Sequence, residues 1–392
     1  MVSCQSVWNG LYFWETGRKL LAFNSTGMVQ MDNIKRQIKK IEFSLFSRFF
    51  SGKYSGKHDP IWIDFRITRR CNLRCIYCNI PDNPLKEFTT EEAKKVLDKI
   101  DGKGRWILIT GGEPLLRDDI KEIIDHIVFS TELKVMLNSN LLLLTKRYDD
   151  VKNVDGFYFS IDGSKETHEK NKGIGSWDRM IEGIELLHKE RRGKISMTTI
   201  TNFTTIDDIR SVLEICRRYE IIPAFQMVRI YNMSRDADKN KPDTGNILRI
   251  FDYLIEQRKK GIIMSNSLKG LKAQKQIAIG RFNKSCYSGR LFAFIESDGT
   301  LGLCFSRPKD PGYLNLLDEN ISFKQALKAF DKVKPHIKRC FGCSCMAPVE
   351  FALVSPFDLD VINDNNKSFS RNIRLENEHV KRLEKEAHET GD

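Results

Sequence analysis

The stretch RRCNLRCIYCNIP (residues 69–81) places three cysteines, Cys71, Cys75 and Cys78, within eight positions. It follows a β-rich run, and its three thiolates can meet at one metal centre. Structural zinc sites close with four ligands, commonly from paired Cys-x2-Cys units, so three thiols do not complete one. A 4Fe-4S cluster held by three thiolates leaves one iron open for a substrate or cofactor. The missing fourth cysteine is therefore interpreted as the functional feature of this loop.

Alternating β and helical patterns surround the cysteine loop and predict six parallel strands. Helical patterns include residues 89–100, with Thr90 as the expected cap, and residues 176–191, with apolar residues on one face. A chain of this kind closes as a barrel or stays open as a doubly wound sheet, and periodicity alone leaves both arrangements open. The expected strands are residues 61–68, 105–110, 133–139, 156–162, 194–201 and 223–228.

Polar or glycine-rich stretches follow the first four expected strands. In both the barrel and the open sheet, the ligand binds at the carboxyl ends of the strands. These stretches therefore predict a binding site at that edge of the sheet. They are RRCNLRC (69–75), TGGEP (110–114), NSN (138–140) and SIDGS (160–164).

The cysteine loop resembles the cluster-binding signature of the radical S-adenosylmethionine (radical SAM) superfamily, including the aromatic Tyr77 before the last cysteine. GGEP at 111–114 resembles the segment that binds the SAM amino group, and SIDGS at 160–164 resembles the strand end that contacts the ribose. The resemblance covers about residues 59–235 and implies an α/β fold with a partial (βα)6 TIM-type barrel rather than an open sheet.

The same resemblance implies roles for single residues. Glu113 is expected to bind the SAM ammonium, because a carboxylate accepts charged hydrogen bonds. Ser160 and Asp162 are expected at the ribose, although Asp162 reads equally well as a turn residue before Gly163. The full set of cofactor-binding residues is Tyr77, Gly111, Gly112, Glu113, Asn138, Asn140, Ser160 and Asp162.

The implied chemistry uses the open iron. SAM would chelate it, and one electron from the reduced cluster would cleave SAM to methionine and a 5'-deoxyadenosyl radical, which takes a hydrogen atom from the substrate. A flavodoxin- or ferredoxin-type protein is the expected electron donor. No motif in the sequence identifies the catalytic side chains or the substrate.

A second cysteine group lies downstream, around a predicted hairpin whose turn is the pair Asp298-Gly299. Its pattern resembles the twitch domain, the shorter relative of the SPASM domain, and implies one auxiliary 4Fe-4S cluster. Zinc is the alternative metal, because tetrahedral sulfur coordination suits either. Cys345 is the fifth thiol for a four-thiol site. Its alternative roles are to replace one of the four ligands, to serve as a hydrogen donor, or to be a buried small residue, which is the favoured interpretation. Cys4 and Cys216 are interpreted as structural. The expected ligands are Cys286, Cys304, Cys340 and Cys343.

At 392 residues, with 41% hydrophobic and 30% charged residues, the chain has the length and composition of a globular protein with one large domain and a smaller one, or with two medium domains. Residues 33–50 form a basic amphipathic pattern, and packing against the protein itself is favoured over contact with an anionic membrane surface. The expected divisions are an N-terminal extension (1–58), the partial barrel (59–235), a helical connector (236–280), a small α+β cluster domain (281–358) and a hydrophilic tail (359–392).

Location and partners follow from what the sequence lacks. The longest apolar run, LLLL at 141–144, is far shorter than the roughly 20 residues that span a bilayer, and the N-terminus has no secretory pattern, which predicts a cytoplasmic protein. The net charge of +12 is interpreted as a solvated basic surface, because no nucleic-acid motif accompanies it.

Three functions are weighed. The leading hypothesis is a radical SAM enzyme that oxidises or rearranges a small-molecule metabolite with the help of the auxiliary cluster. The second is peptide maturation, which the short N-terminal extension disfavours because it lacks room for a winged-helix peptide-recognition domain. The third, from another class, is a non-catalytic iron-sulfur carrier or zinc protein.

Overall fold

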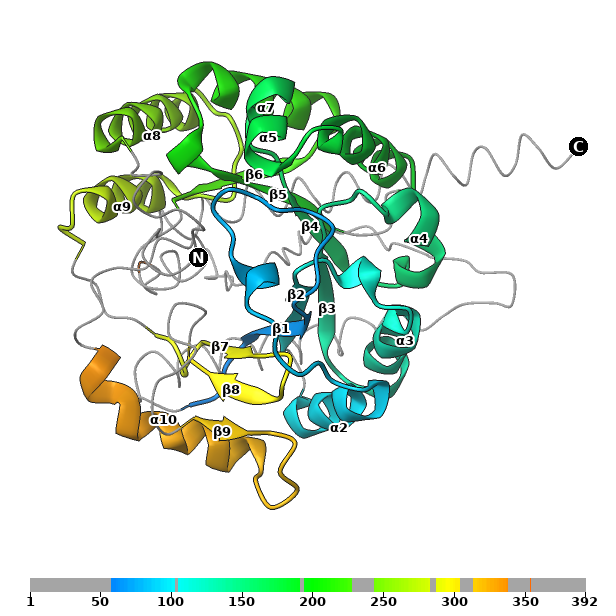
Figure 1. Ribbon diagram of the computed structural model, residues 1–392. Coiled ribbons are helices and arrows are strands. Elements are labelled where there is room, and N and C mark those ends of the chain that lie inside the picture. The colour runs from blue at the N-terminus through cyan, green and yellow to red at the C-terminus, as the bar shows by residue number, and fades with distance from the viewer. Residues whose placement is uncertain are drawn as a thin grey trace, which may run out of the picture.

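The computed structural model describes residues 58–102, 105–190, 194–227, 243–282, 287–303, 313–337 and residue 353. Six parallel strands form its centre and pair in chain order, each with the next. A doubly wound sheet would reverse its strand order at a switch point. The strands instead curve as an arc with helices around its outer side (Figure 1), so the fold is the predicted partial barrel. The strands are β1 (Trp62–Thr68), β2 (Trp106–Gly111), β3 (Lys134–Asn138), β4 (Gly156–Ser160), β5 (Lys194–Ile200) and β6 (Ile222–Gln226).

The helices that cover the arc alternate with the strands, as predicted. Their apolar faces join one hydrophobic core with the outward-facing residues of the strands. They are α2 (Thr90–Ile100), α3 (Ile120–Ser130), α4 (Leu144–Val151), α5 (Lys165–Lys172), α6 (Ser176–Glu190), α7 (Ile206–Arg218), α8 (Thr244–Lys259) and α9 (Leu268–Ala278). Short 3-10 helices lie in the segments that follow β1, β2 and β5. They are η2 (Ile80–Asp82), η3 (Pro114–Leu116) and η4 (Thr201–Phe203).

Strand β1 shows how the two faces of the sheet differ. Ile63, Phe65 and Ile67 are fully buried in the core that includes the apolar faces of α2 and α3. Because side chains alternate along a strand, Trp62 and Asp64 point to the opposite face, the barrel interior. Both are only half-buried.

Two helices test the expected local signals. The predicted cap of the first was wrong by one residue: Thr89 caps α2 and forms a capping box with Glu92, while Thr90 is the first helical residue. The hydroxyl of Thr90 donates to Asp119 on the next β/α unit instead. In α6, Met180, Ile184 and Leu187 share one face and are buried, as the spacing predicts.

The predicted hairpin is confirmed, and it extends the barrel sheet. β7 (Phe292–Ile295) and β8 (Thr300–Gly302) pair antiparallel, and β7 also pairs parallel with β1. Gly299 adopts a φ of +90°, which favours glycine at this turn. With β9 (Leu314–Asn315), the nine described strands form one sheet, and α10 (Phe323–Ile337) lies beside the hairpin (Figure 1).

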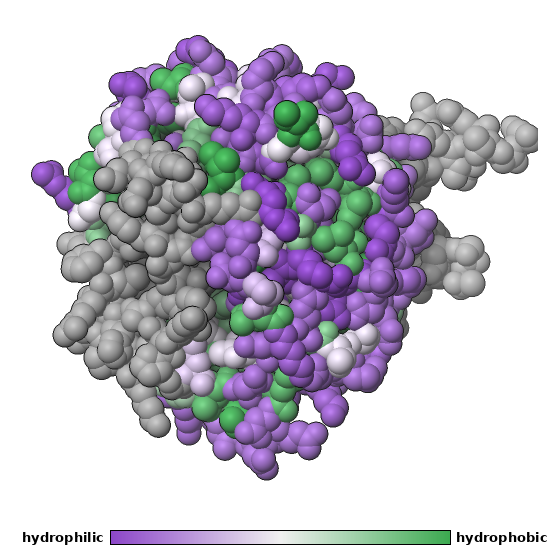
Figure 2. Space-filling model, viewed as in Figure 1, coloured by the Kyte–Doolittle hydropathy of each residue, from purple (hydrophilic) through white to green (hydrophobic). Residues whose placement is uncertain are grey.

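The surface seen in Figure 2 is mainly hydrophilic over the described residues, with small separate hydrophobic patches. The large apolar side chains exposed there or elsewhere on the described surface, such as Phe129 and Ile174, are scattered, as is normal for a globular protein. Among the described residues, no helix combines the length and apolar composition needed to cross a membrane.

Several expectations fall outside the described residues. They concern the basic amphipathic pattern at 33–50, the tail at 359–392, Cys4, and the auxiliary ligands Cys286, Cys304, Cys340, Cys343 and Cys345. The domain boundaries remain predictions. Cys216, interpreted as structural, is buried in the core.

Candidate active site

The three cysteines of the loop after β1 are reduced thiols, each partly exposed. Burial raises the pKa of Cys71 and raises that of Cys75 to about 12, and negative charge on Cys78 would raise both further. Lys172 acts in the opposite direction on Cys75. In the absence of metal the Cys71 and Cys75 thiols therefore carry protons, which a bound metal centre would displace.

The glycine pair of GGEP holds the start of this loop. The Gly112 amide donates to the Thr68 carbonyl at 2.9 Å, and the Glu113 amide donates to the Arg70 carbonyl at 2.8 Å. A Cβ atom on Gly111 would lie 2.2 Å from the Thr68 oxygen, and one on Gly112 would lie 2.1 Å from the Arg70 oxygen. Glycine is therefore required at both positions, because the GGEP backbone is in contact with the backbone of the residues that precede Cys71.

The end of β4 holds the other side of the loop. The Tyr77 hydroxyl donates to Asp162 Oδ2 at 2.6 Å, and the Ile76 amide donates to the carbonyl of Asn171 at the end of α5 at 2.9 Å. The Tyr77 ring also stacks on Phe203, with centroids 5.7 Å apart. In Figure 1 the blue segment after β1 runs across toward α5, in agreement with these contacts.

Asp162 is fully buried beneath Tyr77. Burial raises its pKa, and Lys172, whose Nζ lies 4.0 Å from Asp162 Oδ1, opposes that shift. The Lys172 ammonium also donates to the carbonyl and hydroxyl oxygens of Ser160. Both predicted ribose contacts thus lie at the cysteine loop, engaged with protein partners.

Glu113 is also fully buried. Its Oε1 accepts from the Leu115 amide at 3.0 Å and the Ser139 hydroxyl at 2.9 Å, and its Oε2 accepts from the Asn140 amide at 2.7 Å. Burial still raises the pKa of Glu113 to about 7. The carboxylate therefore joins the loops after β2 and β3, and its expected contact with the SAM ammonium stays a prediction.

The two predicted asparagines lie close by. The Asn140 side chain donates to Asn72 Oδ1 at 2.7 Å, within the cysteine loop. The Asn138 side chain donates to the Thr110 hydroxyl at 3.1 Å, across β2 and β3. The structure thus brings all eight predicted cofactor-binding residues to the same edge of the sheet, and their contacts with SAM remain predictions.

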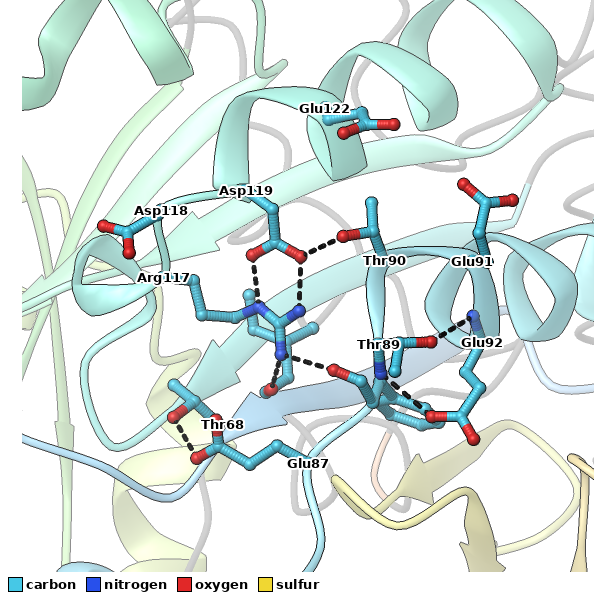
Figure 3. A network of polar contacts seen from close by, with 12 residues as sticks. Thr68, Glu87, Thr89, Thr90, Glu91, Glu92, Arg117, Asp118, Asp119 and Glu122 are labelled. Atoms are coloured by element: carbon cyan, nitrogen blue, oxygen red, sulfur yellow. Dashed lines mark hydrogen bonds and ion pairs between the residues drawn. The ribbon is translucent and has the colours of Figure 1, made fainter.

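Sequence reasoning missed a buried polar network under the end of β1 (Figure 3). Arg117 donates to the carbonyls of Ile67 and Phe88, each at 3.0 Å, and pairs with Asp119. Glu87 accepts from the Thr68 hydroxyl and from the Arg69 amide. These contacts fix the strand end from which the cysteine loop departs, and no motif spacing marks them.

A second missed network connects the loop to the hairpin. Glu296 follows β7, and its Oε2 pairs with Arg66 at 2.5 Å and with Arg69 at 2.8 Å. The Arg66 guanidinium also lies 4.8 Å from the centroid of the Phe294 ring and influences Cys78 electrostatically. Only the pairing of β7 with β1, some 230 residues apart in sequence, brings these groups together.

The donor set fits a cluster better than a single ion. No three His, Cys, Asp or Glu side chains within the described ranges converge closely enough for one metal ion. An iron-sulfur cubane presents a different iron to each thiolate, so the sulfurs need to surround it rather than meet at one point. Three half-buried thiols lie on a loop that is held at both ends, and each could bind a different iron.

Comparison with known proteins agrees with this geometry. Residues 65–216 match the Radical SAM superfamily. This part of the chain is a radical SAM domain. Members of this superfamily are enzymes that use a 4Fe-4S cluster and S-adenosylmethionine, so this radical SAM protein is an enzyme, and the non-catalytic alternative is set aside.

Relatives of this radical SAM enzyme act on different substrates. An AdoMet-dependent heme synthase from Methanosarcina barkeri (strain Fusaro / DSM 804) is 28% identical over 290 residues, 67% of this chain and 79% of that protein. Mycofactocin maturase MftC from Mycolicibacterium smegmatis is 23% identical over 265 residues, 64% of this chain and 65% of that protein. The structure of Streptococcus suis SuiB bound to S-adenosylmethionine shares the fold, with a TM-score of 0.58 and 13% identity over 83% of this chain and 80% of that chain.

Proposed function

We propose that this radical SAM enzyme oxidises or rearranges a small-molecule metabolite held inside the barrel, and that an auxiliary 4Fe-4S cluster assists. When bound, the first cluster and S-adenosylmethionine supply a 5'-deoxyadenosyl radical that takes a hydrogen atom from the substrate. The observation that carries the proposal is the three-thiol loop, held by GGEP on one side and by Asp162 on the other.

The residues of the chain position and shield this site. Cys71, Cys75 and Cys78 would hold the cluster, while Tyr77 fixes the loop on the end of β4. The buried Glu113 aligns the loops that follow β2 and β3. Because the strands curve around the interior and helices cover their outer face, a substrate at the strand ends is partly excluded from water.

The small-molecule class is supported by the heme synthase relative, which matches 79% of its own length. The peptide class is the second candidate, supported by the MftC relative and by the fold shared with SuiB, which has also been solved with its precursor peptide SuiA. Neighbouring genes separate the two: a short precursor gene beside this one favours the peptide.

The auxiliary cluster is proposed from Cys286, Cys304, Cys340 and Cys343, with Cys345 as the surplus thiol. Four thiolates leave no iron open, so its proposed role is electron transfer rather than substrate ligation. We expect Cys340→Ala with Cys343→Ala to keep SAM cleavage and lose product. If Cys345→Ala loses the cluster and Cys343→Ala retains it, Cys345 rather than Cys343 is the ligand.

Anaerobic reconstitution tests the core of the proposal. Two clusters predict about eight irons per chain. Changing Cys71, Cys75 and Cys78 together to Ala should remove one cluster and all formation of 5'-deoxyadenosine with dithionite or a flavodoxin- or ferredoxin-type donor. Cys216→Ala, a buried cysteine away from the loop, is the matched control and should keep both. Cleavage that persists in the triple variant would refute the mechanism.

A further inference from the structure

The floor of the barrel interior is aromatic. Trp62 on β1 and Trp106 on β2 are register partners, and their rings lie 6.4 Å apart at an interplanar angle of 19°. Tyr158 on β4 meets the Trp62 ring edge-on, also at 6.4 Å. We call these three side chains the aromatic floor. All three are half-buried, whereas Ile63 and Ile107, which face the helices, are fully buried.

Asp64 stands directly above the aromatic floor. Its Oδ1 accepts a hydrogen bond from the Trp62 indole at 2.8 Å. Among the described residues, no donor or cation is bonded to its Oδ2. Its register neighbours on the adjoining strands, Leu108 and Phe294, are apolar. A half-buried carboxylate with one oxygen fixed and apolar neighbours on both adjoining strands lacks the compensation that a buried charge requires.

Among the residues that the structure describes, two titratable groups face Asp64. Arg66 lies two residues further along β1, on the same face, but its guanidinium pairs with Glu296. Tyr158 on β4 is hydrogen-bonded to Ser196, and burial raises its pKa, so it stays neutral. Burial raises the pKa of Asp64 to about 6, which agrees with a carboxylate short of a counterion.

We propose that Asp64 and the aromatic floor form a substrate subsite for a protonated nitrogen group, such as an amine, amidine or guanidine, carried on a flat or apolar body. The carboxylate provides the counter-charge, and the faces of the indole rings attract cations. This inference rests on the proposed function, since it names the chemistry of the substrate that enters the barrel.

The depth of the subsite suits a substrate that reaches the cysteine loop. At a rise of about 3.3 Å per residue, Asp64 lies about 7 Å below Arg66 along β1. The cysteine loop departs from the end of β1 at Thr68, two residues beyond Arg66. A small molecule anchored at Asp64 therefore extends toward the loop rather than away from it.

Three probes of one shape and different charge test the proposal: benzamidinium, benzamide and benzoate. Binding to the anaerobically reconstituted full chain is measured by calorimetry. We expect benzamidinium to bind most tightly, and its affinity to fall about tenfold or more in Asp64→Asn, as for a lost charged hydrogen bond. The Asn oxygen still accepts from Trp62, so the variant should fold. Asp178→Asn, an exposed carboxylate on α6, is the control and should bind as the wild type does.

The pH dependence gives a second readout. Benzamidinium stays a cation throughout, so its affinity should rise from about pH 5 to about pH 7 as Asp64 loses its proton, and should be flat in Asp64→Asn. Equal affinity for the three probes, or no binding of any, would overturn the proposal. Formation of 5'-deoxyadenosine is measured in parallel. If the protein forms none but still binds the probes according to their charge, the proposed function is refuted and the subsite is not. If it forms 5'-deoxyadenosine but does not distinguish the probes by charge, only the subsite is refuted.

Discussion

At the scale of single residues, the site depends on buried polar side chains that hold loops in place. Asp162 and Glu113 were expected to contact SAM, and each is fully enclosed and bonded to protein groups. A buried carboxylate that loses a partner leaves an unsatisfied group, which costs more than the bond itself contributes. Substitutions at these positions should therefore act first on the arrangement of the cysteine loop.

The pair Tyr77 and Asp162 gives a direct test. We expect Tyr77→Phe and Asp162→Asn to lower iron retention after anaerobic gel filtration to a similar extent. The double variant should retain only slightly less iron than either single variant, because both substitutions remove the same hydrogen bond. Tyr253→Phe on α8 is the control. If Asp162→Asn weakens SAM binding while Tyr77→Phe does not, the ribose contact implied by the resemblance is correct.

Glu113 predicts a pH dependence of stability. Its pKa is about 7 in the folded chain and 4.5 in the unfolded one, so the favourable contribution of its protonated form is complete below pH 4.5 and is lost as pH rises through 7. Relative to Glu113→Gln, the free energy of unfolding of the wild type should fall by up to about 3 kcal/mol across that window. Urea melts at several pH values measure it, and a constant difference would contradict the assignment.

At the scale of elements, the loop is held where secondary structures end. The GGEP segment continues the pairing of β1 with β2 beyond the strands, and the turn after β7 supplies Glu296 to the arginines of β1 and its loop. The two contacts reach Arg70 and Arg69, the two residues that precede Cys71 in the chain.

Gly112→Ala should displace the cysteine loop. Its new Cβ would lie 2.1 Å from the Arg70 carbonyl oxygen, a backbone atom that can move only with the loop. We expect reduced iron content and loss of SAM cleavage with little change in far-UV circular dichroism. Gly245→Ala, whose Cβ meets only the flexible side chain of Asp243 at 3.2 Å, should behave as the wild type does. Normal iron loading in Gly112→Ala would show that the loop tolerates the shift.

Glu296→Gln should weaken the attachment of the hairpin. The change removes the negative charge that pairs with Arg66 and Arg69, and removing one partner of a buried ion pair typically costs about 3–5 kcal/mol. Thermal melts should show a lower Tm, and the exposed pair member Glu319→Gln serves as control because its partner Lys95 is also exposed. A Tm equal to that of the control would show that the hairpin does not depend on this carboxylate.

At the scale of the whole molecule, one hydrophobic core joins the barrel, the connector helices and the hairpin. Its members come from strands β1 to β8 and from helices on both sides of the cysteine loop, while Cys71 and Cys75 only lie against its edge. The stability of the barrel should therefore come from apolar burial rather than from iron.

Removal of iron tests this directly. After chelation under anaerobic conditions, we expect the far-UV circular dichroism to stay close to that of the loaded protein and the melt to stay cooperative, while SAM binding is lost. A full-length chain with all three loop cysteines changed to Ala should melt in the same way. Unfolding on chelation would show that a cluster, rather than the core, holds the chain together.

The sequence by itself determined the elements whose signals are local. All six barrel strands, the Asp298-Gly299 hairpin and the buried face of α6 follow from short-range alternation, helical spacing and turn chemistry. The predicted cap of α2 was wrong by one residue. Two adjacent threonines carry the same hydroxyl group, and only the backbone geometry at Thr89 selects between them. The cysteine spacing marked the site for the same reason, since neighbouring ligands on one loop need no long-range contact.

Only the tertiary structure decided which groups meet across long separations. The sequential strand order selected the barrel over the open sheet, and the pairing of β7 with β1 brought Glu296 to Arg66. The same pairing of strands brought Trp106 and Tyr158 to the ring of Trp62, beside which the proposed subsite lies. Such contacts join residues that share no spacing or periodicity, because the burial of apolar faces sets them rather than any local conformational preference.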